Sequence, residues 1–167
     1  MSVHLELRCR FCVIYSGDKL FSLAGSLQGI MSAAFNNQSD HVLATSNDNS
    51  TKIWSLESKR LKHTLTGHLA KVYSAKFVGS GAVISGSHDR TIKVWDLVKG
   101  YCTKTLFTIS SCNDLLPLDD DGTTIASGHL DNNIRIWDAK SGNLLKEMTG
   151  MHFGQITSLE MSPCIQD

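Results

Sequence analysis

The stretch Gly86-Ser87-His88-Asp89-Arg90-Thr91-Ile92-Lys93-Val94-Trp95-Asp96 decides the fold. A tight turn at 87–90 leads into a short β-branched strand that ends in tryptophan and aspartate. The same pattern recurs at 47–54 and at 130–138. The turn aspartates and all three tryptophans repeat at intervals of 41 and 42 residues: Asp48, Asp89 and Asp131, and Trp54, Trp95 and Trp137. A fixed period of this length predicts a repeat architecture.

A second element keeps the same period. The apolar residues Leu23, Leu65, Leu106 and Met148 are separated by 42, 41 and 42 positions. Each unit resolves into four short strands with turn signals between them, and the chain has only two prolines and no helical apolar period. The sequence therefore predicts an all-β chain of antiparallel meanders. Four strands per unit with a tryptophan–aspartate ending are typical of a β-propeller blade.

The repeats divide the chain into three parts. Residues 1–16 match nothing later and predict a strand-like or irregular leader of unknown role, and residues 164–167 predict a tail. Residues 17–163 predict a partial propeller, with an outer strand at 19–23, three whole blades at about 30–65, 72–107 and 113–148, and the inner strand of a next blade at 155–161. Three blades cannot close a ring, so we expect an open arc, as in a fragment of a longer propeller.

Composition limits the classes of function. The formal net charge of zero argues against nucleic-acid binding and against a basic membrane-binding surface. No apolar run approaches the length of a membrane span, and charged residues within the first 15 positions exclude a secretory signal. Five irregularly spaced cysteines indicate reduced thiols, and Cys9-Arg10-Phe11-Cys12 is a lone pair that does not predict a zinc site. We expect no cofactor and no metal.

Polar residues of the middle unit predict a hydrogen-bond network. We expect Ser85 to lie opposite Trp95 across the hairpin, and His68 to lie beneath Asp89. Asp89 then accepts from His68, His68 bonds to Ser85, and Ser85 accepts from the indole N–H of Trp95. The same set raises the hypothesis of a catalytic triad, but a nucleophilic serine needs an exposed oxygen, an oxyanion hole and a substrate pocket. We favour the structural role and expect no catalytic residue.

The network is expected to be complete only in the middle unit. The first unit has Ser26 at the histidine position and Ala44 at the serine position, and the third has Ile109 at the histidine position but keeps Ser127. A catalytic device would not be half-repeated at a fixed period, whereas a structural link can vary between blades. The partial repetition therefore favours structure over catalysis.

Two other sets of polar residues are weaker candidates for a metal-binding site. His88 and His129 flank the turn aspartates, and we expect both to be surface turn histidines rather than metal ligands. The run Asp119-Asp120-Asp121-Gly122 lacks the alternating ligands and distal glutamate of a calcium loop, so we expect a solvated turn.

The Gly67-His68 and Trp95-Asp96 pairs resemble the WD-repeat family. Longer matches narrow this to a resemblance to the propeller of the autophagy-related protein 16-like family. They cover 61–68, 71–77, 85–91, 46–48, 127–129 and the stretch Ser110-Ser111-Cys112-Asn113-Asp114. That last stretch is the most specific, because generic WD repeats lack it. The resemblance runs from about residue 17 to residue 163.

This resemblance implies a cytoplasmic scaffold whose propeller recruits partners and directs lipid conjugation to autophagosome precursor membranes. It implies protein or peptide partners, among them components of the autophagy conjugation complex, and membrane association only through them. It also implies a role for Phe107, which matches an aromatic residue of the family, and it draws attention to Asn133, which stands where the family usually has lysine.

Propellers present their ligand surface where the turns converge, and loops held by rigid strands often carry function. The candidate partner-binding face consists of Asn47, Leu69, Lys71, His88, Phe107, Ser110, Cys112, Leu130 and Asn133. Our main hypothesis is a non-catalytic protein-interaction scaffold, the WD-repeat portion of an autophagy protein. The alternative is a WD-repeat subunit of an unrelated complex, such as one for ubiquitin-ligase substrate recognition. A third hypothesis is an enzyme with Ser85 as its nucleophile.

Overall fold

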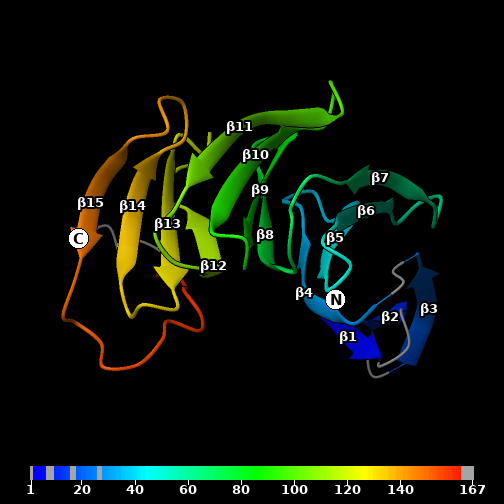
Figure 1. The fold of residues 1–167 in the computed structure, drawn as a ribbon. Coiled ribbons are helices and arrows are strands. Elements are labelled where there is room, and N and C mark those ends of the chain that lie inside the picture. Colours follow the sequence, from blue (N-terminus) through cyan, green and yellow to red (C-terminus); the bar gives the residue numbers. More distant parts are fainter. Residues whose placement is uncertain (1, 7–9, 16–17, 26–27, 163–167) are drawn as a thin grey trace, which may run out of the picture.

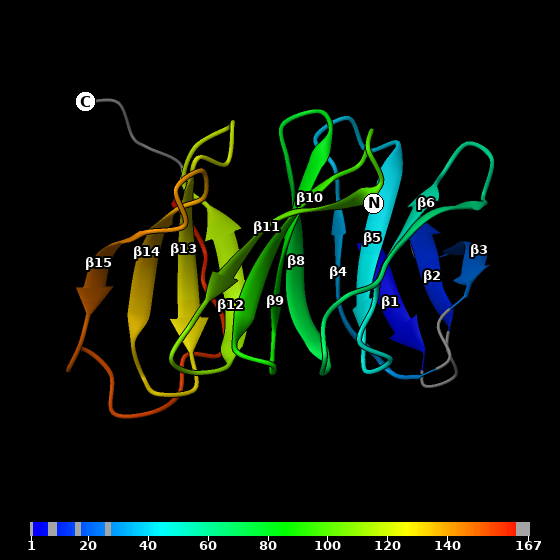
Figure 2. The ribbon, with the colours of Figure 1, turned by 45° about the horizontal axis from the view of Figure 1, so that its top comes forward.

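The computed structural model describes residues 2–6, 10–15, 18–25 and 28–162. Among these residues there are strands and turns but no helix, and so no helix that could cross a lipid bilayer. The strands form antiparallel sheets that stand side by side in an open arc (Figures 1 and 2). This arrangement confirms the predicted all-β, partial propeller.

Three of the sheets are four-stranded meanders in which sequence neighbours are hydrogen-bonded. The first contains β4 (Ile30–Phe35), β5 (His41–Ser46), β6 (Thr51–Ser55) and β7 (Leu61–Leu65). The second contains β8 (Val72–Val78), β9 (Ala82–Ser87), β10 (Thr91–Asp96) and β11 (Tyr101–Phe107). The third contains β12 (Cys112–Pro117), β13 (Thr124–His129), β14 (Ile134–Asp138) and β15 (Leu144–Met148). We call these sheets the first, second and third blades.

The hairpins that carry the turn aspartates share one backbone conformation. The residue after each aspartate lies in the left-handed region, with φ of 64° at Asn49, 63° at Arg90 and 68° at Asn132. Asparagine adopts this region readily, and the aspartate before it helps by accepting backbone N–H groups within the turn. We call the end of the blades that bears these hairpins the aspartate-turn face.

A fourth sheet precedes the first blade and contains β1 (Ser2–Glu6), β2 (Arg10–Tyr15) and β3 (Asp18–Ala24). Its register repeats a detail of the blades. The pairing shifts between Val94 and Trp95 in the second blade, and it shifts in the same way between Val13 and Ile14 in β2. β2 is therefore the counterpart of β10, and Ile14 stands where the blades have tryptophan. That replacement explains why the leader matches no later repeat in sequence although it forms strands.

The core lies between the blades as well as within them. One cluster joins Ile53 and Leu65 of the first blade to Ala75, Val83 and Trp95 of the second. Another cluster joins Ile84 and Ile92 of the second blade to residues of the third, which are Cys112, Leu115, Ile125, Trp137 and Ala139. Leu23 of β3 packs with Val42, Ala44 and Trp54 of the first blade. Each blade thus buries its apolar surface against its neighbours.

Two glycines at equivalent positions lie tightly against the segment that follows their blade. A side chain at Gly86 in β9 would collide with Cys112 and Leu115 of the next blade. A side chain at Gly128 in β13, one repeat later, would collide with Ile156. At these two positions a residue without a Cβ leaves room for the side chains of the segment that follows.

The expected inner strand at 155–161 does not form, and this prediction is wrong in its secondary structure. The segment nevertheless lies against the third blade, because Ile156 is buried and its N–H donates to the His129 carbonyl at 3.0 Å. It lies beside Gly128 as β12 lies beside Gly86, but among the described residues no second strand pairs with it. The predicted tail at 164–167 and the residue Cys9 lie outside the described residues.

Candidate protein-interaction face and the network beneath it

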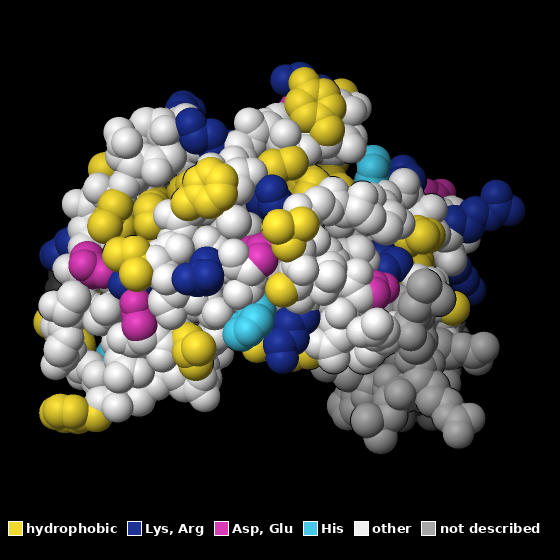
Figure 3. Space-filling view, viewed as in Figure 1, with side chains coloured by type: hydrophobic (Ala, Val, Ile, Leu, Met, Phe, Trp, Pro, Cys, Tyr) yellow, Lys and Arg dark blue, Asp and Glu magenta, His cyan; other side chains and the backbone are white. Residues whose placement is uncertain are grey.

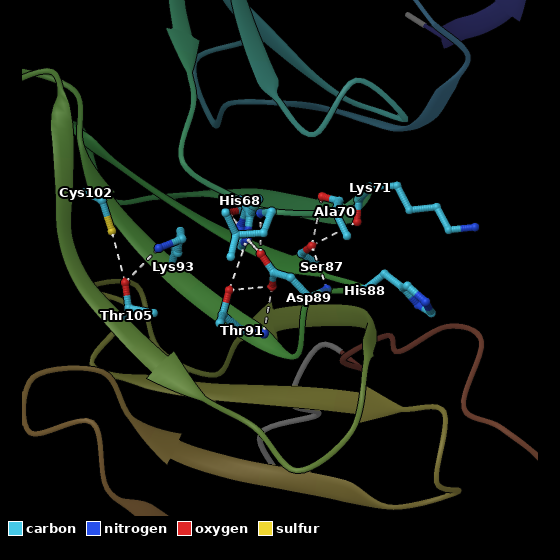
Figure 4. A network of polar contacts seen from close by, with 12 residues as sticks. His68, Ala70, Lys71, Ser87, His88, Asp89, Thr91, Lys93, Cys102 and Thr105 are labelled. Carbon is cyan, nitrogen blue, oxygen red and sulfur yellow. Dashed lines mark hydrogen bonds and ion pairs between the residues drawn. The ribbon is translucent and has the colours of Figure 1, made fainter.

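A hydrogen-bonded chain of four side chains ties the second blade together beneath its aspartate turn, and Figure 4 shows the end of this chain at His68 and Asp89. Trp95 Nε1 donates to Ser85 Oγ at 2.8 Å, and Ser85 Oγ lies 2.8 Å from His68 Nε2. His68 Nδ1 lies 2.9 Å from Asp89 Oδ2. Because the carboxylate can only accept, Nδ1 carries the proton, and Nε2 accepts from the serine hydroxyl. All contacts predicted for this network are present.

The predicted strand register was wrong by two residues. Ser85 pairs with Lys93 across the hairpin, and Trp95 pairs with Val83. Ser85 and Trp95 are therefore diagonal neighbours on one face of the sheet. A diagonal separation is within reach of a large aromatic side chain, so the indole N–H still meets the serine hydroxyl.

The carboxylate of Asp89 accepts several further hydrogen bonds in and beside the turn. It accepts from the N–H of Leu69 at 2.8 Å, from the N–H of Thr91 at 2.9 Å and from Thr91 Oγ1 at 2.6 Å. Burial acts to raise the pKa of Asp89, but the hydrogen bonds from His68, Thr91 and Leu69 outweigh it and hold that pKa well below its usual range. Asp89 thus joins the connector before the blade to the hairpin within it.

The third blade rebuilds the network with a different histidine. Trp137 Nε1 donates to Ser127 Oγ at 2.7 Å, and Ser127 Oγ lies 2.7 Å from His129 Nε2. His129 Nδ1 donates to the carbonyl of Ser110 at 3.1 Å. The prediction that His129 is a surface turn histidine is wrong, because its side chain is 0% exposed. It fills the space that Ile109, which is exposed, leaves at the position of His68.

Basic residues replace the histidine as the partner of the turn aspartate in the other two blades. Lys52 Nζ lies 2.7 Å from Asp48 Oδ2, and Arg135 binds Asp131 with two nitrogens at 2.6 and 3.1 Å. The corresponding Lys93 of the second blade donates instead to Thr105 Oγ1, because His68 already holds Asp89. Sequence reasoning missed these pairs, although a basic residue follows every turn aspartate by four positions. Ser26 lies outside the described residues.

The position of Ser85 does not suit a nucleophile. Its side chain is 0% exposed, and its oxygen is engaged by both Trp95 and His68. A nucleophilic serine needs an accessible oxygen beside a substrate site. Among the described residues, no group of three or more histidine, cysteine, aspartate or glutamate side chains could hold a metal ion.

Each aspartate turn is tied to the connector before its blade by the same backbone bond. The N–H of Asn47 donates to Gly29 at 2.9 Å, that of His88 to Lys71 at 3.0 Å and that of Leu130 to Ser111 at 3.1 Å. The side chains of Asn47, His88 and Leu130 are exposed at these equivalent positions. The face therefore consists of loops that the blades hold in place.

Further exposed apolar side chains lie in this region. Leu69, in the connector before the second blade, is 87% exposed, and Phe107, at the end of β11, is 80% exposed. Lys71, Ser110 and Asn133 are partly buried. The expectation that Cys112 belongs to the exposed surface is wrong, because it is 0% exposed. It packs against Gly86 in the core between two blades, where burial raises the pKa of its thiol.

His88 is held by partners that the sequence did not reveal. Its ring lies edge-on to Tyr73, with centroids 5.9 Å apart, and Nδ1 lies 3.0 Å from Ser111 Oγ. Lys71 Nζ stands 5.3 Å from the centroid of the same tyrosine ring. Figure 4 shows the side chains of Lys71 and His88 extending in the same direction, away from the network. Tyr73 and Ser111 come from the inner strand of one blade and the connector to the next, so only the fold brings them together.

The repeated meanders, their tryptophan–serine contacts and the ordered loops at one end define a β-propeller of the kind built from WD repeats. Comparison with the family "WD domain, G-beta repeat" gives matches at residues 17–55, 59–96 and 100–138. The chain belongs to this WD-repeat family. It is also similar to the WD40 β-propeller domain of Doa1, with a TM-score of 0.81 and 24% identity, over 92% of this chain and 52% of that one.

Similarity to longer proteins identifies the kind of WD domain. Over 90% of the length of this chain, its sequence is 50% identical to protein tipD of Dictyostelium discoideum. Over 88% of the length of this chain, it is 44% identical to autophagy-related protein 16 of Arabidopsis thaliana. It is 35% identical to autophagic-related protein 16.2 of Caenorhabditis elegans over 87%. The WD domain is therefore autophagy-related protein 16-like. The chain spans 24%, 29% and 27% of the lengths of these relatives.

Proposed function

We propose that this chain is a non-catalytic protein-interaction scaffold and that its aspartate-turn face recruits protein or peptide partners. The observation that carries the proposal is the repeated backbone bond that ties each turn to its connector. It holds Asn47, His88 and Leu130 at equivalent positions, with Leu69 and Phe107 exposed on loops or strand ends of the second blade. Exposed apolar side chains on rigid loops supply contact area with little loss of conformational entropy on binding.

We assign this recruitment to autophagosome assembly, because the relatives with 44% and 35% identity are named autophagy-related proteins. The partners proposed are components of the autophagy conjugation complex in the cytoplasm, and membranes are reached only through them. The formal net charge of zero favours protein partners over nucleic acid. In Figure 3 charged side chains of both signs are mixed with apolar ones over the visible face, in keeping with that balance.

The test is affinity capture from cells with the tagged chain, followed by quantitative mass spectrometry. The variant Leu69→Ser with Phe107→Ser removes the two most exposed apolar side chains that the second blade and the connector before it contribute to this face. Leu145→Ser is the matched control, because Leu145 is 59% exposed but lies on the outer strand β15. Autophagy conjugation proteins should be enriched by the wild type and by the control, and lost with the double variant.

Two outcomes would contradict the proposal. Equal capture of autophagy proteins by the double variant and the control would show that this region does not bind them. Enrichment of ubiquitin-ligase subunits without any autophagy protein would support the alternative function instead.

A further inference from the structure

A hollow lies at the end of the blades opposite the aspartate-turn face. It has a volume of about 230 Å³ and lies between the first and second blades. Lys62 and His63 of β7 form one side, while Leu97 and Val98 of the β10–β11 turn form the other. Ile53 and Phe77 connect it to the apolar cluster between the two blades. We call it the inter-blade groove. Figure 3 shows apolar side chains in a hollow between the projecting β10–β11 hairpin and β7.

The apolar side of the groove is rigid and open. Val98 is 91% exposed, although its turn is firmly held. Asp96 Oδ1 accepts from the N–H groups of Val98 and Lys99 at 2.9 Å each, and the N–H of Leu97 donates to Gly81 at 2.9 Å. Phe77 and Leu97 are only partly buried beside it. An apolar side chain from outside could therefore enter the groove without any rearrangement of the turn.

The other side of the groove is basic. Lys62, His63 and His41 line it, and its described lining contains no aspartate or glutamate. The nearby Asp40 is already engaged, at 2.7 Å from His41 Nδ1 and 2.6 Å from Asn36 Nδ2. Burial, the largest cause, together with Lys62 and His41 lowers the pKa of His63, so this ring is neutral near pH 7 and Lys62 supplies the positive charge of this wall. A carboxylate brought into the groove would meet the Lys62 ammonium and no competing acidic side chain of the described lining.

The corresponding groove between the second and third blades has different chemistry. It is larger, at about 330 Å³, and Val94, Thr103, Lys104 and Lys140 stand where the inter-blade groove has Ile53, Lys62, His63 and Val98. It also contains an acidic residue, Asp121. The combination of an apolar rim with an exclusively basic wall therefore belongs to the inter-blade groove and is not a general property of the repeat.

We propose that the inter-blade groove docks an acidic peptide segment of a protein partner. One apolar side chain of the peptide enters among Phe77, Leu97 and Val98, and flanking carboxylates face Lys62 and His63. The volume is below the about 300–1,000 Å³ of small-molecule pockets, so it suits a single side chain better than a cofactor. This site is distinct from the aspartate-turn face, so it can bind whether or not that face does.

The experiment measures fluorescence anisotropy of labelled peptides with the whole chain. The probe is Glu-Glu-Gly-Leu-Gly-Glu-Glu, and the control peptides replace its leucine with serine or its glutamates with lysines. The leucine-containing acidic probe should bind about tenfold more tightly than either control, a difference that one buried apolar side chain or a favourable charge set can supply. Probe binding should produce NMR shifts at the amides of 62–63, 79–81 and 97–98.

Variants separate this groove from its counterpart. Lys62→Glu should lower the affinity for the probe about tenfold, and Val98→Ser should lower it about threefold to tenfold. Lys140→Glu makes the same charge change in the counterpart groove and should have no effect. Lys62, Val98 and Lys140 are exposed, so all three variants should melt as the wild type does.

The proposal fails if the serine peptide binds as tightly as the leucine probe, because binding would then be charge attraction alone. It also fails if Lys140→Glu weakens the probe as much as Lys62→Glu does, or if none of the peptides binds. Loss of the aspartate-turn function with Leu69→Ser and Phe107→Ser would leave these measurements unchanged, so the two proposals fail separately.

Discussion

Ser127 and His129 lie two residues apart on β13, and their side chains are hydrogen-bonded at 2.7 Å. In the second blade the corresponding bond joins Ser85 to His68, which comes from the connector before the blade. The histidine comes from the connector in the second blade and from the end of β13 in the third, while the serine and the tryptophan occupy equivalent positions in both. The same polar core can therefore be supplied by residues from different parts of the unit.

His129→Ala should destabilise the chain by about 2–3 kcal/mol, because it leaves a cavity in the core and removes the hydrogen bonds that His129 makes with Ser127 and with the Ser110 carbonyl. Urea unfolding measures the change. Ile109→His combined with His129→Ser reproduces the pattern of the second blade, and it should recover part of the loss. A neutral result for His129→Ala would show that its hydrogen bonds contribute nothing to stability.

Trp95→Ala should lower the free energy of unfolding by about 3–5 kcal/mol, since Trp95 is 3% exposed in the core between two blades. Trp95→Phe keeps most of the apolar volume but removes the N–H that Ser85 accepts, so it should cost about 1–2 kcal/mol. Thermal and urea unfolding measure both changes. A loss below about half a kilocalorie per mole for the alanine variant would show that the indole contributes little to packing.

Thr51→Val should raise stability by about 1 kcal/mol. Thr51 Oγ1 is buried and has no hydrogen-bond partner among the described residues, and the corresponding positions of the other blades are Ile92 and Ile134. Thr91→Val is the control, because Thr91 Oγ1 donates to Asp89 and its loss should be destabilising. If both variants were destabilised alike, the Thr51 hydroxyl would have a partner in solution.

Asp89 should make the free energy of unfolding depend on pH in the acid range. Its pKa in the folded chain lies below the unfolded value of about 3.9, so the stabilisation from its carboxylate is fully present above about pH 4. It is lost as the pH falls toward the folded-state pKa. The difference in unfolding free energy between the wild type and Asp89→Asn should therefore shrink between pH 5 and pH 2. A difference that stays constant over this range would show that the Asp89 pKa is unperturbed.

The period of 41 and 42 residues was sufficient to predict the blades, the tryptophan–serine–histidine–aspartate contacts and the open arc. It left the leader open between strand-like and irregular, because the pairing of residues 2–6 and 10–15 depends on backbone hydrogen bonds that do not require tryptophan. It also misplaced Cys112, since the polar residues around it suggested a surface. Burial of Cys112 depends on Gly86 of the preceding blade, which makes space for it.

The candidate site was predicted only in part. The positions of Leu69, His88 and Leu130 followed from the turns and that of Phe107 from the family resemblance, and all four are exposed. The aromatic contact of His88 with Tyr73 and its bond to Ser111 depend on how one blade is set against the next, which no local pattern encodes. The inter-blade groove was missed for the same reason, because its two walls come from different repeats.

Gly86 and Gly128 have a consequence for how such chains can diverge. Gly86 is a point at which the second blade meets the third, and Gly128 holds the equivalent place against Ile156, where the missing side chain allows the close approach. Polar cores and loop chemistry can change from module to module, as His68 and His129 illustrate. Alanine at either glycine would act as a wedge and change the curvature of the whole array, leaving the interior of each module intact.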